Sequence, residues 1–338
     1  MISVQPLLQL DDAISLFGEK ILKSVLLVRQ GGLGDLLAVL PSLGFLRAAF
    51  PSYRLTLVCR EEYGRLFLAT GMVDVLEADS GARFSGLFSD SGSLPDDTAS
   101  WLAGFDLVLG WMQGPAGRVM EKSISRFGKP CRRIVYEPGR ELSVSRYFFE
   151  ATRECFKVGA ANSPRFDDYI FLPIASEKRV SSRSAIEKLG IRCGERFAVI
   201  HPGAGNRSKR WPLQNFLTVA AHLSRKGVPG LLVTGEAEAE LETELDRAVL
   251  PRSWTRLTKP DILELAVYLA ESKLYIGNDS GVTHLAAGCG TQVLAVFRRE
   301  NESNWRPNGR VLLFSAEDVA SVSVESLKIA ASHALQIT

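Results

Sequence analysis

Short apolar runs alternate with longer segments of helical spacing along most of this chain. The first set of runs predicts strands at 24–30, 54–59, 73–79, 105–111 and 132–138. The second set predicts strands at 196–203, 230–235, 273–279, 292–297 and 310–314. Most of these runs are almost uniformly apolar, as is typical of parallel strands that helices cover on both faces. The alternation therefore predicts an α/β protein with two successive doubly wound, Rossmann-like domains that face a central cleft.

The segments between the runs are consistent with this architecture. Apolar residues at helical spacing predict helices over 35–51, 176–191, 213–227 and 323–336. Pro41 lies inside the first of these helices and is expected to kink it. Residues 80–100 are rich in Gly, Ser and Asp and predict an exposed loop.

The chain has 338 residues, and this length favours two domains, because a single core rarely grows beyond ~250–300 residues. The stretch 159–176 lacks clear periodicity and contains two prolines. We interpret it as a linker between an N-terminal domain over 1–160 and a C-terminal domain over 177–338. The last predicted helix is a candidate to pack back on the N-terminal domain.

The composition excludes several classes of protein. The net charge is only +2, which disfavours a general affinity for nucleic acid. The five cysteines are far apart and form no CxxC pair, so a disulfide framework and a zinc site are both disfavoured. No stretch is apolar enough to cross a bilayer, and the N-terminus lacks the basic region of a secretory signal. We therefore expect a cytoplasmic protein without a metal site.

The first candidate for chemistry is RQGGLGDLLAVLP, residues 29–41. Glycines between a strand and a helix let the backbone approach a ligand closely. The stretch is not a dinucleotide fingerprint, because Leu37 stands where the third glycine of GxGxxG would be. Asp35 has two interpretations: it is the N-cap of the helix, or its carboxylate points into the interdomain cleft and accepts a proton from a hydroxyl.

The second candidate is HPGAGNRSKRWP, residues 201–212. Gly203, Ala204 and Gly205 leave room for backbone N–H groups to face an anion, and Lys209 adds a mobile full charge. Pro212 suits the first turn of the helix that follows. The alternative interpretation is a tight turn with a solvated basic rim.

The third candidate is YIGNDSGVTHLAAGCG, residues 275–290. Asp279 can accept hydrogen bonds from sugar hydroxyls, and the amides of Ser280 and Gly281, together with Thr283, can face a phosphate. His284 lies in the first turn of the predicted helix, where a structural hydrogen-bonding role is the simpler interpretation. Together with Lys209, these turns describe a seat for a diphosphate.

The sequence resembles glycosyltransferase family 9, the bacterial heptosyltransferases, which have the GT-B fold. GDLLAVLP is similar to the family's N-terminal Gly-Asp…Pro element, and HPGAGNRSKRWP is similar to its Pro-Gly-Ala…Lys-x-Trp-Pro element. The block KPDILELAVYLAESKLYIGNDSGVTHLAAGCGTQVLAVF is similar over nearly its whole length. The similarity covers roughly 23–58 and 196–297, with the motifs in the family's order.

The resemblance implies an inverting, metal-independent transfer of heptose or a related sugar. The donor would be an ADP-sugar, the acceptor a hydroxyl of a lipopolysaccharide-type molecule, and no further cofactor is implied. The N-terminal domain would bind the acceptor and the C-terminal domain the nucleotide sugar.

Roles carry over from the family residue by residue. Asp35 matches the general base, and Lys209 matches the lysine at the donor phosphate. Asp279 matches the residue near the donor sugar, and Glu238, in the acidic run 235–248, matches an acid that holds the ribose. The remaining donor-binding matches are Gly203, Ala204, Gly205, Ser280, Gly281 and His284.

Two regions depart from the family pattern. Residues 298–309, RRENESNWRPNG, replace a small-residue turn of the Gly-Pro-Thr-Asp-Pro kind, with Arg298 and Arg299 where small residues are usual. Residues 80–176 show no counterpart on inspection. Both departures bear on which donor sugar and which acceptor are used.

The segment 118–157 carries ten basic and five acidic residues. It is interpreted either as scattered solvated charge or as a basic wall for an anionic lipid-linked acceptor or the inner-membrane surface. Arg132 and Arg133, with Gly34 beside Asp35, are the candidate acceptor contacts.

Other functions remain open at this point. The same fold supports nucleotide-sugar epimerases, and a non-catalytic nucleotide-sugar binding protein would keep the same donor seat. A nicotinamide dehydrogenase is disfavoured by the failed glycine fingerprint.

Overall fold

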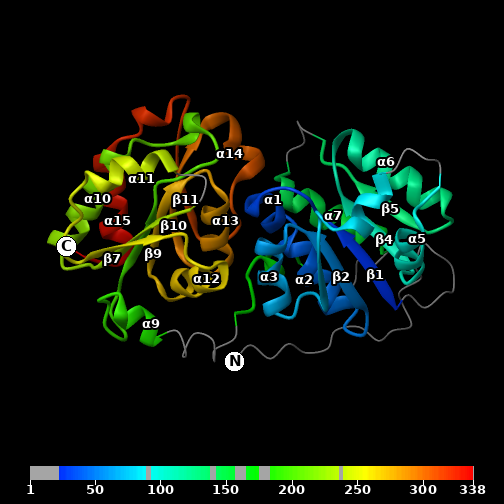
Figure 1. The fold of residues 1–338 in the computed structure, drawn as a ribbon. Coiled ribbons are helices and arrows are strands. Elements are labelled where there is room, and N and C mark those ends of the chain that lie inside the picture. Colours follow the sequence, from blue (N-terminus) through cyan, green and yellow to red (C-terminus); the bar gives the residue numbers. More distant parts are fainter. Residues whose placement is uncertain are drawn as a thin grey trace. The chain divides into compact units, whose positions relative to one another are not determined.

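The computed structural model describes residues 23–88, 93–137, 142–156, 165–174, 183–235 and 239–337. The chain divides into two compact units, Met1–Ile170 and Phe171–Thr338, each built of a parallel sheet with helices around it (Figure 1). The division falls inside the predicted linker 159–176. Just after this division, the Leu172 N–H donates to the Gly288 carbonyl at 2.8 Å, a contact within the second unit.

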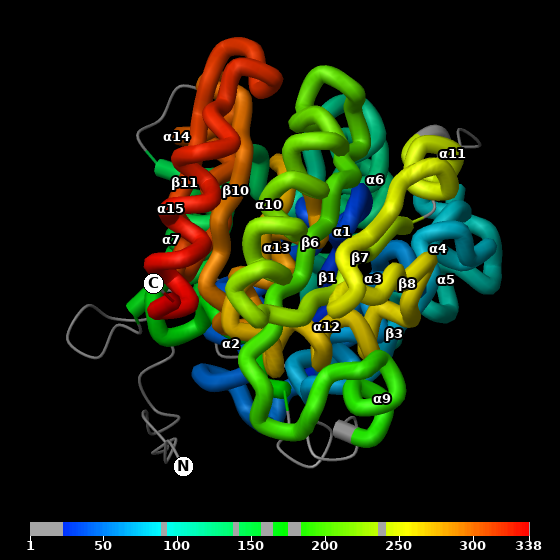
Figure 2. Tube along the Cα trace, turned by 90° about the vertical axis from the view of Figure 1, so that its left-hand side faces the viewer, coloured from blue at the N-terminus to red at the C-terminus, as the bar shows by residue number. Residues whose placement is uncertain are grey.

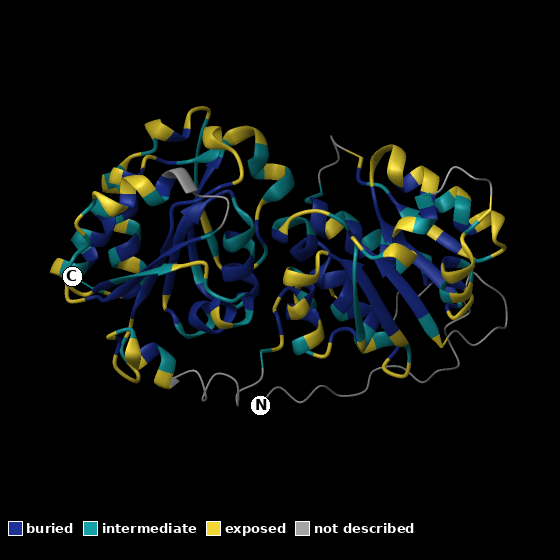
Figure 3. Cartoon of the chain, viewed as in Figure 1, coloured by how far each residue is buried: buried dark blue, intermediate teal, exposed yellow. Residues whose placement is uncertain are grey.

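The first unit contains a five-stranded parallel sheet in the order β3-β2-β1-β4-β5. Its strands are β1 (Ser24–Val28), β2 (Arg54–Cys59), β3 (Val75–Ala78), β4 (Leu107–Trp111) and β5 (Cys131–Ile134). The central strand β1 is buried over its last four residues, as its apolar sequence predicts (Figure 3).

Helices surround this sheet. They are α1 (Leu33–Leu37), α2 (Leu40–Ala49), α3 (Glu61–Ala69), α4 (Ala82–Ser85), α5 (Asp96–Ala103), α6 (Gly114–Arg126) and α7 (Val144–Cys155), with 3₁₀ turns η2 (Gly86–Phe88) and η4 (Phe166–Tyr169). The turn η4 packs on α2, and the rings of Phe149 and Phe166 meet edge to face with centroids 5.5 Å apart. These contacts join residues 166–169 to the first unit.

Two predictions in this unit are wrong. Pro41 does not kink one long helix: the helix ends at Leu37, and a new one begins at Leu40, so that Pro41 lies in a first turn, where no backbone N–H is needed. Residues 80–100 are not simply an exposed loop, since they contain α4, η2 and the first part of α5. The side chains of Phe84 and Leu87 are buried in the core beneath them.

The second unit contains a six-stranded parallel sheet in the order β11-β10-β9-β6-β7-β8. Its strands are β6 (Ala198–His201), β7 (Gly230–Thr234), β8 (Trp254–Thr258), β9 (Leu274–Asn278), β10 (Gln292–Arg298) and β11 (Val311–Ala316). Both sheets confirm the predicted fold class of two Rossmann-like α/β domains.

The helices of the second unit are α9 (Arg183–Lys188), α10 (Leu213–Arg225), α11 (Ala239–Asp246), α12 (Ile262–Glu271), α13 (Gly281–Gly288), α14 (Arg299–Trp305) and α15 (Val324–Leu335), with 3₁₀ turns η5 (Arg207–Lys209) and η7 (Val319–Ser321). The last helix, α15, lies beside α10 and against β10 of its own unit (Figure 2). Leu327 and Ala331 of α15 join the core there. Packing of this helix on the N-terminal domain stays a prediction.

The edge strand β8 was missed by the sequence analysis. Its sequence, WTRLT, is mostly polar and lacks the continuous apolar run of the other strands. At the edge, Trp254 and the half-buried Leu257 are its only apolar residues, and Arg256 pairs with Glu242 and Asp246 of α11. An edge strand can be this polar because it has only one strand neighbour.

The pairing of β7 with β8 gives the first testable prediction. Gly230 lies opposite Trp254, and a Cβ atom at Gly230 would come within 2.5 Å of the indole ring. We expect Gly230→Ala to lower the free energy of unfolding by about 1–3 kcal/mol through overpacking, measured by urea denaturation. Adding Trp254→Leu should make the combined loss smaller than the sum of the single losses. Simple additivity would contradict the steric explanation.

Candidate functional site

The residues singled out in the second unit follow the carboxyl ends of adjacent strands. The strands β10, β9 and β6 are neighbours and run parallel, so the segments that follow them, 299–305, 279–284 and 202–210, emerge at one edge of the sheet. The segment that holds Asp35 follows the central strand β1 of the first unit in the same way.

Asp35 lies at the third position of α1, and the N-cap is Gly32. The expectation that Asp35 is the N-cap residue is therefore wrong. The Asp35 carboxylate does cap the helix, but from the third helical position. Its Oδ2 accepts a hydrogen bond from the Gly32 N–H at 3.0 Å. Gly31 has φ +124°, and a Cβ there would lie 2.7 Å from the same oxygen, so this position requires glycine. Gly34 lies half-buried in α1.

Arg29 is a partner of Asp35 that the sequence analysis missed. The Arg29 Nη2 donates to Asp35 Oδ1 at 2.8 Å, Nε to the Asp35 carbonyl at 3.0 Å and Nη1 to the Trp111 carbonyl at 2.8 Å. The guanidinium also stacks over Phe148. Burial lowers the pKa of Arg29 from its usual value, and the Asp35 charge opposes that shift. The Asp35 side chain, fixed by these contacts, remains 39% exposed.

In the second unit, the structure brings Lys209 and Asp279 together. The Lys209 Nζ lies 2.7 Å from Asp279 Oδ2, and the Lys209 and Asp279 side chains are 31% and 7% exposed. Lys209 ends the short turn η5, which begins after Asn206, whose side chain accepts from the Ser208 N–H at 3.0 Å. Two residues 70 positions apart, both predicted to bind the donor, thus form one charge pair.

The loop after β6 combines buried and open positions. Gly203 and Ala204 are buried, whereas Gly205 is exposed, and a Cβ atom added there would meet only open space. The Arg210 Nε donates to the Ala204 carbonyl at 3.0 Å, so this cation braces the loop. Pro212 is the N-cap of α10 and not its first helical residue.

Asn278 holds this loop against β9, and the sequence analysis missed it. Its fully buried side chain accepts from the Trp211 N–H at 3.0 Å and donates to the Pro202 carbonyl at 2.8 Å. These two bonds span the loop that carries Gly203 to Lys209. One buried amide therefore fixes the loop beside Asp279.

At the start of α13, Ser280 is the N-cap and Gly281 the first helical residue. The prediction that Thr283 faces a phosphate is wrong, because its buried hydroxyl lies 3.0 Å from the Tyr275 hydroxyl and donates to the Asn278 carbonyl. His284 is half-buried and meets the Trp305 ring edge to face, with centroids 6.4 Å apart.

The segment 298–309 contains a helix, α14, where the sequence analysis expected a turn. The Asn301 Nδ2 donates to Asp279 Oδ2 at 2.8 Å, which makes Asn301 a second missed residue of this site. The Arg298 Nη1 lies 3.2 Å from Glu300 and 3.5 Å from the Ser208 hydroxyl. None of the motifs in the sequence analysis contained Asn301.

Glu238 lies outside the described residues. Further along the acidic run, Glu242 is not merely solvated, because it accepts a hydrogen bond from the Thr234 hydroxyl and pairs with Arg256. This acid ties α11 to β7 and β8.

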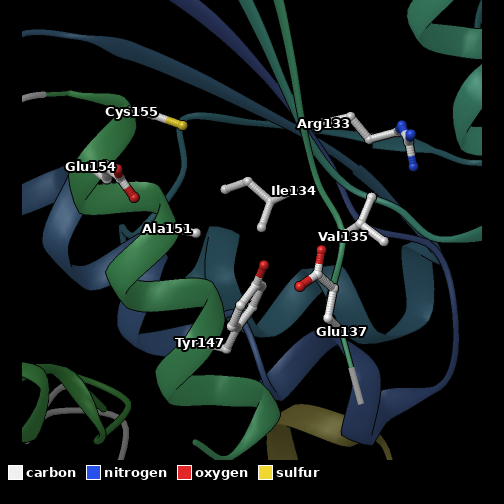
Figure 4. A pocket seen from close by; sticks show the side chains of 8 residues that line it. All are labelled: Arg133, Ile134, Val135, Glu137, Tyr147, Ala151, Glu154 and Cys155. Atoms are coloured by element: carbon white, nitrogen blue, oxygen red, sulfur yellow. The ribbon is translucent and has the colours of Figure 1, made fainter. Parts of the chain in front are cut away.

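Arg132 and Arg133 lie on the edge strand β5. Arg132 is exposed, and the Arg133 Nε donates to Glu121 at 2.8 Å. A surface pocket of about 420 Å³ is lined by Arg133, Ile134, Val135, Glu137, Tyr147, Ala151, Glu154 and Cys155. In it, the Arg133 guanidinium points away, while the Tyr147 hydroxyl and the Glu137 carboxylate point inward (Figure 4). The pocket therefore does not present a cation to an anionic acceptor.

Cysteines and clusters of metal-ligating side chains are the remaining candidates for chemistry. Within the described ranges, no three His, Cys, Asp or Glu side chains gather closely enough to hold a metal ion. The five cysteines form no disulfide, and burial raises the pKa values of Cys59 and Cys131 to about 12. None of the helices in the described part of the chain is long and apolar enough to span a bilayer.

The sequence profile of glycosyltransferase family 9 (heptosyltransferase) matches residues 132–324. The match includes 132–176, so the expectation that this stretch has no counterpart is wrong. Lipopolysaccharide heptosyltransferase 3 of Escherichia coli is 29% identical over 150 residues, which are 43% of this chain and 43% of that protein. The match thus spans less than half the length of this curated relative. Lys209 and Asp279 lie inside the family match, whereas Asp35 precedes it.

Two solved structures resemble nearly the whole chain. The glycosyl transferase family 9 protein of Veillonella parvula has a TM-score of 0.76 at 17% identity, covering 93% of this chain and 97% of that one. The E. coli ADP-heptose lps heptosyltransferase II has a TM-score of 0.72 at 14% identity, covering 93% and 98%. At these identities the likeness shows the fold, which is the predicted GT-B arrangement of two Rossmann-like domains.

Asn278 gives the prediction for this site. Asn278→Ala would leave the Trp211 N–H and the Pro202 carbonyl unpaired in the interior. We expect a loss of about 2–4 kcal/mol in the free energy of unfolding, measured by urea denaturation. Asn206→Ala is the matched control, because it removes two exposed hydrogen bonds in the same loop. Equal losses in the two variants would refute the role given to Asn278.

Proposed function

Since the chain belongs to glycosyltransferase family 9, we propose that it transfers a sugar from a nucleotide diphosphate donor to a hydroxyl group. The observation that carries the proposal is the Lys209–Asp279 pair at the ends of β6 and β9, inside the region that matches the family. A mobile cation and a buried carboxylate side by side suit a diphosphate and a sugar.

The donor seat would combine three elements of the second unit. Lys209 would contact the diphosphate, the amides at the start of α13 would face the same charge, and the open position at Gly205 would admit it. Asp279 would accept from sugar hydroxyls, and Glu238 would hold the ribose.

The identities of donor and acceptor rest on relatives. One similar structure is named as an ADP-heptose lps heptosyltransferase, and one curated relative as a lipopolysaccharide heptosyltransferase. We propose ADP-heptose as the donor and a lipopolysaccharide-type acceptor, with Gly34 and Arg132 on the acceptor side.

The proposed step inverts the configuration at the anomeric carbon and uses no metal ion. The acceptor oxygen attacks this carbon from the face opposite the diphosphate, the bond to the diphosphate breaks, and Asp35 takes the hydroxyl proton. Arg29 and the Gly32 amide hold the carboxylate in one orientation while leaving it accessible. Lys209 and the α13 amides would stabilise the leaving diphosphate, an effect of about 3–4 kcal/mol for each well-placed group. The step requires the Asp35 carboxylate to reach the bound donor across a cleft, which stays a prediction.

Two alternatives are separated by simple incubations. A nucleotide-sugar epimerase would isomerise the donor without an acceptor. A non-catalytic binding protein would bind the donor and turn over no acceptor.

Asp35→Asn tests the base. The amide keeps the size of the side chain but cannot take a proton, so turnover should fall by about 10²–10⁴-fold. Donor affinity should stay near that of the unmodified protein, because the donor binds to the second unit. The measurements are ADP release with a heptose-deficient lipopolysaccharide acceptor and calorimetric titration with ADP. Near-normal turnover would show that Asp35 is not the base.

Lys209→Met serves as the contrasting variant. It removes the charge that would bind both the ground-state diphosphate and the leaving group, so both affinity and turnover should decline. A variant with intact ADP affinity would remove Lys209 from the donor seat.

We also propose a peripheral contact with the anionic inner-membrane surface on the cytoplasmic side. The exposed residues Arg118, Lys122 and Arg126 recur every four positions along α6 and share one face. Val119 beside them is 37% exposed. Glu121 lies half-buried and is engaged by Arg133. The α6 face, with its three exposed cations, fits an anionic bilayer better than Arg133, whose guanidinium is paired with Glu121.

Charge reversal tests the contact. Lys122→Glu with Arg126→Glu should weaken binding to phosphatidylcholine vesicles containing phosphatidylglycerol by about tenfold or more, at roughly 1 kcal/mol per cation. Arg225→Glu with Lys226→Glu, at the exposed end of α10, is the control with the same charge change. Co-sedimentation measures both, and equal binding by the two variants would remove α6 from the contact.

A further inference from the structure

Helix α14 and the residue before it contact three parts of the site in the second unit: Asp279, helix α13 and the turn η5. Asn301 bonds to Asp279, Trp305 meets His284, and Arg298, directly before the helix, lies 3.5 Å from Ser208 in the turn that holds Lys209. Segment 298–305 therefore forms part of the site in this chain.

The contact between Asn301 and Asp279 has a defined polarity. A carboxylate oxygen only accepts hydrogen bonds, so the Asn301 atom that faces it must be the amide nitrogen. The same oxygen, Asp279 Oδ2, also receives the Lys209 ammonium at 2.7 Å. One oxygen of a carboxylate that is 7% exposed thus has two donors, one charged and one neutral.

This arrangement matters when a diphosphate approaches. Lys209 is the more exposed partner of the pair, and a phosphate oxygen would compete with Asp279 for its ammonium. A buried carboxylate that loses its only donor is destabilised, which would hold the lysine in place. Asn301 removes this obstacle, because it keeps Asp279 Oδ2 hydrogen-bonded after the lysine turns away.

We infer that Asn301 is a positioning residue. It keeps Asp279 hydrogen-bonded, so that the Lys209 ammonium can leave Asp279 and bind the β-phosphate of a nucleoside diphosphate. The inference rests on the proposed function, because it assigns the diphosphate to Lys209. It adds a residue that none of the sequence motifs contained, on helix α14. Because the inference assigns Lys209 to the β-phosphate, loss of the Asn301 bond should lower affinity for a diphosphate and not for a monophosphate.

The experiment compares each nucleoside diphosphate with its monophosphate. ADP and AMP, UDP and UMP, and GDP and GMP are titrated calorimetrically into the full chain and its variants. Asn301→Leu keeps the approximate size and removes the donor, and Asn301→Asp keeps the shape but places a second acceptor beside Asp279. Asn304→Leu makes the same chemical change one turn along α14 and is the control.

For the best-bound pair, we expect both Asn301 variants to lose about tenfold in diphosphate affinity, the scale of one hydrogen bond to a charged group. Monophosphate affinity should be unchanged, and Asn304→Leu should match the unmodified chain. A general loosening of the site would lower both affinities together, so the diphosphate-to-monophosphate ratio separates release of Lys209 from structural damage.

The outcomes distinguish this inference from the proposed function. If the unmodified chain prefers diphosphates and the Asn301 variants keep the full preference, the role of Asn301 is refuted while the donor seat stands. If the variants lose monophosphate affinity equally, Asn301 is structural and the inference is again refuted. If the unmodified chain does not prefer any diphosphate, the donor seat itself fails, and the inference fails with it.

Discussion

The parallel pairing of β6, β9 and β10 is the constraint on which the site in the second unit depends. Parallel strands end at the same edge, so the loop after β6, the turn after β9 and the helix after β10 emerge side by side. The Asn278 side chain then fixes the first of these against the second through two buried hydrogen bonds. Lys209 and Asp279, far apart in sequence, meet because of this register.

Charge compensation is common to both units. Asp35 is paired with Arg29, and Asp279 with Lys209, and in each pair one partner is buried and the other is more exposed. The order is reversed between them: the exposed partner is the acid in the first unit and the lysine in the second. The exposed partner is the one whose charge the proposed reaction uses, as the base in the first unit and as the phosphate ligand in the second. Removing the exposed partner should therefore cost more than a single contact, because the charge of the buried partner would be left uncompensated.

The sequence was sufficient for the strands that are fully covered and for the motifs that lie at their ends. It missed β8, because a polar edge strand carries a weak apolar signal, and it missed the break at Pro41, because helical spacing continues across it. Asn278 and Asn301 escaped for a different reason. A single amide acquires its role from two partners that are distant in the chain, and no local pattern records that geometry. Arg29 lay inside a recognised motif, but only the structure shows that its guanidinium is buried against Asp35.

The family match covers every element of the site in the second unit. The match covers Lys209, Asp279 and the start of α13, and these residues form the charge pair and the helix terminus. Helix α14 lies inside the same match, and it supplies a hydrogen bond to the buried acid at the centre of that group. A segment that bonds to a central residue cannot vary independently of it, because a change in α14 alters how tightly Asp279 holds Lys209. A change in α14 should therefore alter the donor seat through Asp279, next to Lys209 and the start of α13 and not at these residues themselves.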